Sequence, residues 1–159
     1  MDRLLPSIIV GFVIVAALIG MFFGWRARQR RQAGIPAPEA VPADVGAIRT
    51  AVSGLYVATT RAGEPLERIA VRGLGYRSRM VATVADRGVT LELTGARPAF
   101  IPATALRSAG RATWAIDKAV EPGGLVVLGW RLGDLDVDSY FRIDGEAQAF
   151  IDAAAGITA

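Results

Sequence analysis

Arginine is the residue type in this chain that is best suited to bind a ligand, and four arginines lie close together in the sequence: Arg68, Arg72, Arg77 and Arg79. A guanidinium group holds phosphate or carboxylate oxygens with paired N–H donors, so this group indicates contact with an anionic lipid headgroup or with a partner. A second interpretation stays open. Because Lys118 is the only lysine among the 18 basic residues, the four arginines also fit a solvated strand face that pairs with Glu64 and Glu67.

Three aspartates alternate with apolar residues near the C-terminus: Asp134, Asp136 and Asp138. A calcium-binding EF-hand loop that began at Asp134 would need glycine at its sixth position and glutamate at its twelfth, where this chain has Ser139 and Gly145. The required ligand spacing fails, so we predict no metal site. The alternation predicts a turn that leads into an edge strand, where charge discourages aggregation.

Histidine and cysteine are both absent. Without cysteine the chain has no disulfide, iron–sulfur cluster or thiolate zinc site, and without histidine it has no Ser-His-Asp triad. The stretch 73–75, Gly-Leu-Gly, lacks the third glycine and the following helix of a dinucleotide-binding fingerprint. We therefore predict a protein that is not an enzyme and holds no cofactor. Trp114 and Trp130 are expected in the core rather than in a ligand site.

Charge is unevenly distributed along the chain. Residues 61–111 carry nine arginines and four acidic residues, whereas residues 112–159 carry three basic and eight acidic residues. This pattern predicts a dipolar domain and argues against a nucleic-acid-binding protein, which would present a single basic face.

The N-terminal part of the chain contains a long uncharged stretch. Ser7 to Trp25 contains no charged residue, and as a helix it would be about 28 Å long, close to the thickness of the hydrocarbon core of a bilayer. We interpret it as a single transmembrane helix. A cleaved signal peptide is disfavoured, because the charge lies on the wrong side, the apolar core is too long and no small-residue cleavage site precedes the arginines.

The residues that flank this stretch predict its orientation. Four arginines follow it at once: Arg26, Arg28, Arg30 and Arg31. Positive charge is retained on the cytoplasmic side, so the N-terminus is expected outside and the rest of the chain in the cytoplasm. Trp25 suits the headgroup level, and the arginines attract anionic lipid there. Ala16, Gly20 and Gly24 share one helix face and predict a weak homodimer contact.

The remaining sequence divides into a linker and one domain. We expect a short outer tail (1–6), the transmembrane helix (7–25), a basic and Pro/Ala-rich linker (26–46) and a cytoplasmic domain (47–159). Short runs rich in β-formers predict strands, listed here by range: 55–60, 66–71, 79–85, 89–93, 100–102, 111–117, 125–131 and 137–143. Residues 103–109 suit a helical turn. Asp144 is expected to cap a closing helix with an apolar stripe at 147, 150, 151 and 154.

Two of these stretches resemble a known family. Residues 81–91, VATVADRGVTL, resemble the L-x-x-T-x-x-R hairpin of GRAM and bacterial PH modules, and residues 100–106, FIPATAL, are similar to the I-P-x-x-x-I segment that follows it. The order of elements resembles the pleckstrin-homology-like (PH-like) fold, and the full layout is similar to small bacterial PH-like proteins anchored by one span. The resemblance covers residues 47–157. It implies a bent antiparallel sandwich or split barrel of about seven strands, capped by a C-terminal helix.

The resemblance also carries expectations about function. In phosphoinositide-binding PH domains a basic residue on one strand and a basic-x-basic pair on the next contact the headgroup, and Arg72 with Arg77 and Arg79 is similar to that pattern. We expect a tethered module that recruits a protein partner at the bacterial inner membrane. The alternatives are a sensor of anionic lipid that uses the four arginines, and an accessory subunit of a transporter or export complex.

Overall fold

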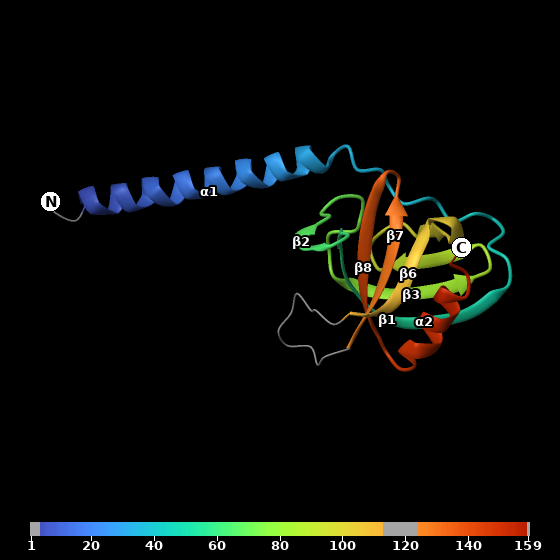
Figure 1. The fold of residues 1–159 in the computed structure, drawn as a ribbon. Coiled ribbons are helices and arrows are strands. Elements are labelled where there is room, and N and C mark those ends of the chain that lie inside the picture. The colour runs from blue at the N-terminus through green and yellow to red at the C-terminus, as the bar shows by residue number, and fades with distance from the viewer. Residues whose placement is uncertain (1–3, 113–123, 159) are drawn as a thin grey trace. The chain divides into compact units, whose positions relative to one another are not determined.

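A computed structural model describes residues 4–112 and 124–158. The chain divides into two compact units, residues 1–34 and residues 35–159. The first unit contains one helix, α1 (Leu4–Gln32), and the second, here called the β unit, contains all the strands and a closing helix (Figure 1).

Helix α1 is apolar over most of its length. Pro6 lies in its first turn, where a missing N–H breaks no intrahelical bond, and the large side chains that follow are exposed in the structure. The stretch Pro6–Ala27 has a mean hydropathy of 2.6 and is long and apolar enough to cross a membrane. The helix also continues past the expected end at Trp25, so the four juxtamembrane arginines are part of it rather than of a linker.

The β unit is one antiparallel sheet that does not close on itself. The strands follow the order β5-β4-β3-β1-β8-β7-β6 across the sheet, and β2 pairs with the end of β1. In chain order they are β1 (Ile48–Arg61), β2 (Glu64–Arg68), β3 (Ser78–Ala85), β4 (Gly88–Leu93), β5 (Ala99–Pro102), β6 (Leu106–Ala112), β7 (Leu125–Leu132) and β8 (Leu135–Ile143).

Strand β1 joins the two halves of the sheet. Its first part pairs with β3 and its second part with β8, and the two pairings overlap between Gly54 and Tyr56. The ladder with β8 shifts register between Tyr56 and Ala58, as expected where a strand bends. Gly54 suits this crossing because a Cβ there would collide with the carbonyl oxygen of Arg142 on β8.

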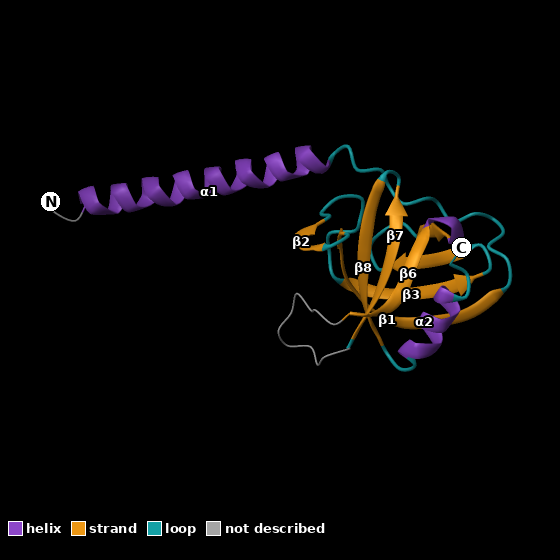
Figure 2. Ribbon diagram, in the orientation of Figure 1, coloured by secondary structure: helices purple, strands orange, loops and turns teal. Residues whose placement is uncertain are grey.

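Helix α2 (Ala147–Ala155) closes the unit against one side of the sheet (Figure 2). Its buried residues are Phe150, Ile151 and Ala154, which belong to the predicted apolar stripe. The Phe150 ring contacts Phe141 of β8 edge to face, with the ring centroids 6.3 Å apart, and Phe141 in turn lies 6.0 Å from Tyr56 of β1. The helix therefore covers the point at which the two halves of the sheet meet.

Several local predictions need correction. Asp144 does not cap α2: Glu146 precedes the helix without a side-chain cap, and the Asp144 carboxylate pairs with Arg79. The turn expected over 103–109 is a 3-10 helix, η1 (Ala103–Ala105), and β6 begins directly after it because the chain pairs with β7 there. Of the strand predicted at 111–117, the first two residues end β6. The rest of it, including Trp114, lies outside the described residues.

Residues 35–46, here called the strap, pack on the sheet. Ile35 is buried, the N–H of Phe100 donates to the carbonyl of Glu39 at 2.8 Å, and the N–H of Arg87 donates to the carbonyl of Val45 at 3.0 Å. The sequence placed these residues in an extended linker because no hydrophobic period runs through them. Their contacts instead join them to the β unit, and two residues, Ala33 and Gly34, separate α1 from Ile35.

Candidate functional site

The loop 69–77 carries two of the predicted arginines and is held by a buried polar network. Ile69 and Leu74 of this loop are both buried in the core. The Tyr56 hydroxyl donates to the carbonyl of Leu74 at 2.8 Å and contacts the hydroxyl of Thr59 at 2.7 Å. Because burial removes water from the phenol, the pKa of Tyr56 lies well above its ordinary value of 10.0. The loop backbone is therefore anchored from within the core, and its arginines lie on the outside.

The four arginines predicted from the sequence come from three parts of the β unit, which are β2, the loop 69–77 and β3. Arg68 ends β2 opposite Thr60, and Arg77 is exposed just before β3. Arg79 lies on the outer face of β3 and pairs with Asp144, with 2.8 Å between Nη1 and Oδ2. Arg72 hydrogen-bonds through Nε to the carbonyl of Ile35 at 3.4 Å. Arg72 and Arg79 therefore have different partners, from opposite ends of the chain.

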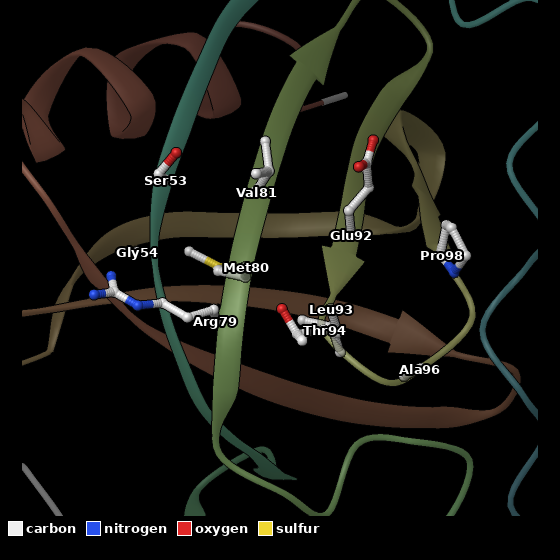
Figure 3. Close-up of a pocket in the computed structure, with 10 residues that line it drawn as sticks. All are labelled: Ser53, Gly54, Arg79, Met80, Val81, Glu92, Leu93, Thr94, Ala96 and Pro98. Carbon is white, nitrogen blue, oxygen red and sulfur yellow. The ribbon is translucent and has the colours of Figure 1, made fainter.

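Arg79 borders a hollow of about 500 Å³ on the outer face of the sheet (Figure 3). Ser53 on β1, Val81 on β3 and Glu92 on β4 lie side by side across its floor, as their pairing requires. Val81 is 39% exposed, which is high for a valine on a central strand. The hollow thus has a small apolar centre between an ion-paired arginine and a carboxylate.

A second cavity of about 500 Å³ lies between the strap and two tight turns. Arg72 and Gly73 are the central residues of one turn, in which the N–H of Leu74 donates to Val71, and Gly95 belongs to the other. Both glycines have positive φ, and so does Arg72, with φ 60°. A non-glycine residue in this region is strained by about 1 kcal/mol or more. Arg97, which follows the second turn, also lines the cavity.

Sequence reasoning missed this second cavity. Arg97 is separated from Arg72 by 25 positions in the sequence, and the strap that forms one wall of the cavity has the Pro/Ala-rich composition of a linker. The available signal was weak: Arg72-Gly73 and Gly95 mark turns, and turns are frequent places for binding residues. Nothing in the sequence alone indicated that these turns would lie on either side of one space.

The acidic group around Asp136 is engaged by arginines. Asp136 pairs with Arg131 of β7 and with Arg107 of β6, so its carboxylate neutralises cations on neighbouring strands. The pairs Arg79–Asp144 and Arg107–Asp136 each join the basic stretch 61–111 to the acidic stretch 112–159. The charge separation seen along the sequence is thus partly cancelled in space, because β8 lies inside the sheet between β1 and β7.

The juxtamembrane residues lie on α1. Trp25 is half-exposed and its ring contacts Phe22, with centroids 6.2 Å apart, while the side chains of Arg26 and Arg30 are exposed. Arg28 and Arg31 belong to the same helix. A Cβ at Gly20 or Gly24 would meet no other atom within 4 Å, so the face shared with Ala16 is open in this chain.

Comparison with solved structures finds similarity to two structures of Vav1. One is described as Vav1 inhibited by an allosteric inhibitor, with 10% identity, a TM-score of 0.46 and coverage of 83% of this chain and 32% of that chain. The other, the apo structure of an activated truncation of Vav1, has 11% identity, a TM-score of 0.46 and coverage of 84% and 32%. This chain thus spans about a third of the length of each. No curated protein sequence matches this chain.

A family model described as bacterial PH domain-like matches residues 35–154. The match begins at Ile35, which is also where the β unit begins, and it ends within α2. It confirms the resemblance seen in the two short motifs, and with it the predicted bent antiparallel sheet closed by a C-terminal helix. The chain belongs to the bacterial PH domain-like family.

Proposed function

We propose that this protein is a non-enzymatic module that recruits a protein partner to the cytoplasmic face of a bacterial inner membrane. In this proposal α1 spans the membrane with its N-terminus outside, and the β unit is the recruiting part. The observation that carries the proposal is the direct connection between the two: an apolar helix of spanning length ends at Gln32, and a domain of an interaction-module family begins at Ile35.

Tethering makes weak contacts effective. A domain joined to a membrane helix by two residues is confined to the membrane surface, so its effective concentration towards other membrane components is high without any gain in intrinsic affinity. Recruitment of a partner therefore needs only a modest surface on the β unit.

The outer face of β1, β3 and β4 is the surface that we assign to the partner. Tyr76 is 73% exposed next to Arg77, and Arg79 borders the hollow that has Val81 at its centre. An exposed aromatic, arginine side chains and a small apolar depression are the features that protein interfaces favour. The side-chain contacts of Arg79 and Arg72 within the chain give less support to the alternative of a lipid sensor that uses all four arginines together.

Co-purification of the full chain in mild detergent tests the proposal. We expect one membrane or cytoplasmic protein to be retained in constant ratio by the wild-type chain and lost, at least tenfold, by the double variant Arg77→Glu/Arg79→Glu. The matched control is Arg131→Glu, which reverses another exposed, ion-paired arginine on β7.

The outcomes separate the candidate functions. If the double variant and the Arg131→Glu control retain the partner equally, the assignment of this surface is contradicted. If only variable, abundant proteins are recovered, the recruiting role is contradicted. A partner that is itself a transporter or export component would make the protein an accessory subunit of that complex.

A further inference from the structure

Most of the arginines of the β unit whose contacts the structure gives are neutralised by an aspartate. Arg49 pairs with Asp86 and Arg87 with Asp44, both at 2.9 Å. Arg79 pairs with Asp144, and Arg107 and Arg131 both pair with Asp136. These contacts are typical of surface arginines and need no ligand to explain them.

Arg72 and Arg97 differ from these arginines. Within the parts of the chain that the structure describes, neither of them forms an ion pair with a carboxylate. The contact of Arg72 is with a neutral carbonyl, that of Ile35, through Nε, which leaves the outer nitrogens of its guanidinium group for another acceptor. Both residues line the same cavity between the strap and the two turns.

The shape of the cavity suits a small ligand. Its volume of about 500 Å³ lies within the range of small-molecule sites. Apart from the charged residues, its walls are small and apolar, with alanines and prolines from the strap and from residues 96–99, and the two glycines allow the backbone to approach a ligand closely. Arg72, which lines the cavity, has a left-handed backbone conformation, a strain that is typical of binding sites.

The net charge of the residues that line the cavity indicates the charge of a ligand that would fit. The two arginines contribute two positive charges and Glu39, which also lines the cavity, contributes one negative charge. The sum of +1 matches an anion with a single negative charge and several acceptor oxygens. A phosphodiester has this charge and offers two equivalent oxygens to two guanidinium groups. We propose that this cavity binds a phosphodiester, carried either by a phospholipid headgroup or by a soluble glycerophosphodiester.

The site is independent of the recruiting role. It uses the strap and the turns around Gly73 and Gly95, whereas the surface assigned to the partner lies around Arg79 and Val81. Failure of the co-purification experiment would therefore leave this inference standing, and failure of the inference would leave the recruiting role standing.

A fluorescent reporter at the cavity tests the proposal on the full chain. The protein has no cysteine, so Ala40→Cys, at an exposed position that lines the cavity, takes a single environment-sensitive dye. The dye is followed in detergent during titration with soluble glycerophosphoglycerol, and in nanodiscs of phosphatidylcholine with and without phosphatidylglycerol. A saturable change in either arm supports the site, and the arm that responds identifies the source of the phosphodiester.

Three variants in the labelled protein make the test specific. Arg97→Gln and Arg72→Gly should each weaken binding at least tenfold. Arg72→Gly should also keep the thermal midpoint, because glycine accepts the left-handed conformation without strain. Glu39→Gln should strengthen binding, since it removes the one negative charge of the cavity.

The control is Arg142→Gln, which removes another exposed arginine without an ion pair in the described residues, on β8 and outside the cavity. No response in either arm, an equal loss with Arg142→Gln, or weaker binding by Glu39→Gln would each overturn the proposal.

Discussion

At the scale of single residues, the best-determined feature is a chain of hydrogen bonds through the core. The indole N–H of Trp130 donates to Ser139 at 2.9 Å, Ser139 contacts Thr59 at 2.6 Å, and Thr59 contacts Tyr56, which donates to the carbonyl of Leu74. An indole nitrogen only donates and a carbonyl only accepts, so the two ends fix the direction of every bond between them. Each hydroxyl then donates once and accepts once, and the network is stable although it is buried.

Replacing Tyr56 with phenylalanine should destabilise the β unit by about 1–3 kcal/mol at neutral pH, because Leu74 loses its donor and Thr59 its acceptor in a buried place. Urea unfolding of the full chain in detergent, followed by the loss of β-sheet circular dichroism, measures this difference. Thr158→Ala is a suitable control, since it removes a partly buried hydroxyl bond at the C-terminal end of the chain. Equal effects of the two substitutions would contradict a special role for the network.

The same residue makes stability depend on pH in the alkaline range. Burial raises the pKa of Tyr56 above its ordinary value of 10.0, so above that pH the unfolded chain releases a proton that the folded chain keeps. Stability is therefore fully present below pH 10 and falls as the pH rises, by up to about 1.4 kcal/mol per pH unit. Tyr140, whose pKa is also raised by burial, adds to this slope.

Urea unfolding at pH about 8 and at pH about 11 tests this dependence. The difference in free energy of unfolding between wild type and Tyr56→Phe should be smaller at the higher pH, because the variant lacks the pH-dependent contribution of Tyr56 and keeps that of Tyr140. A gap that stays constant would show that the phenol ionises equally well in the folded protein.

At the scale of elements, the strap changes the definition of the domain. It covers β5 and reaches the β3–β4 turn, where Arg87 of the turn bonds to Val45 and pairs with Asp44. Its single buried large side chain, Ile35, belongs to the main core cluster. The strap therefore acts as part of the β unit and also forms one wall of the second cavity.

Ile35→Ala should lower the free energy of unfolding by about 2 kcal/mol, since it removes most of a buried side chain and leaves a cavity in the core. Val41→Ala, at an exposed position of the same strap, should change it by less than about 0.5 kcal/mol. Denaturant midpoints of the full chain measure both values. If the strap were a free tether, the two variants would behave alike.

At the scale of the whole molecule, the two units differ in how much apolar surface they expose. The large side chains of α1 are exposed along the helix, whereas the β unit has a closed core in which no buried side-chain polar atom of the described residues lacks a hydrogen bond. An exposed apolar surface of that extent is not stable in water, and its length matches a bilayer. This difference between the units agrees with the proposal that α1 is a membrane anchor for the β unit.

The anchored form should resist alkaline carbonate extraction of membranes and remain at its full mass of 16.8 kDa. The double variant Val13→Arg/Ile14→Arg should move to the soluble fraction, because each arginine at the centre of a span costs about 2.5–3.5 kcal/mol. Immunoblotting of pellet and supernatant measures both. A wild-type chain recovered as a shortened soluble species would show that the N-terminal stretch is a cleaved signal.

The sequence was sufficient for the main features that depend on neighbouring residues, although not for the N-cap of α2 or the end of α1. The uncharged run 7–25, the hairpin around residues 86–87 and the apolar stripe of α2 follow from local periodicity and turn chemistry, and the structure has helix, hairpin and helix at these places. The PH-like fold was also predictable, because the order of its strands and helix can be predicted from the sequence and because two of its motifs are short and contiguous.

The tertiary structure decided what depends on residues that are far apart in sequence. Asp144 pairs with Arg79 of β3, and Asp136 with Arg107 of β6, because the sheet inserts β8, its last strand in sequence, between β1 and β7 and so brings its residues near strands that lie much earlier in the chain. The strap belongs to the β unit because its backbone pairs with the edge of β5 and Ile35 fills a position in the core. Neither contact has a local signature in the sequence. For the same reason the sequence could not indicate that Arg72 and Arg97 line one cavity. The two turns at which they lie are distant in the sequence, and only the packing of the chain brings them together.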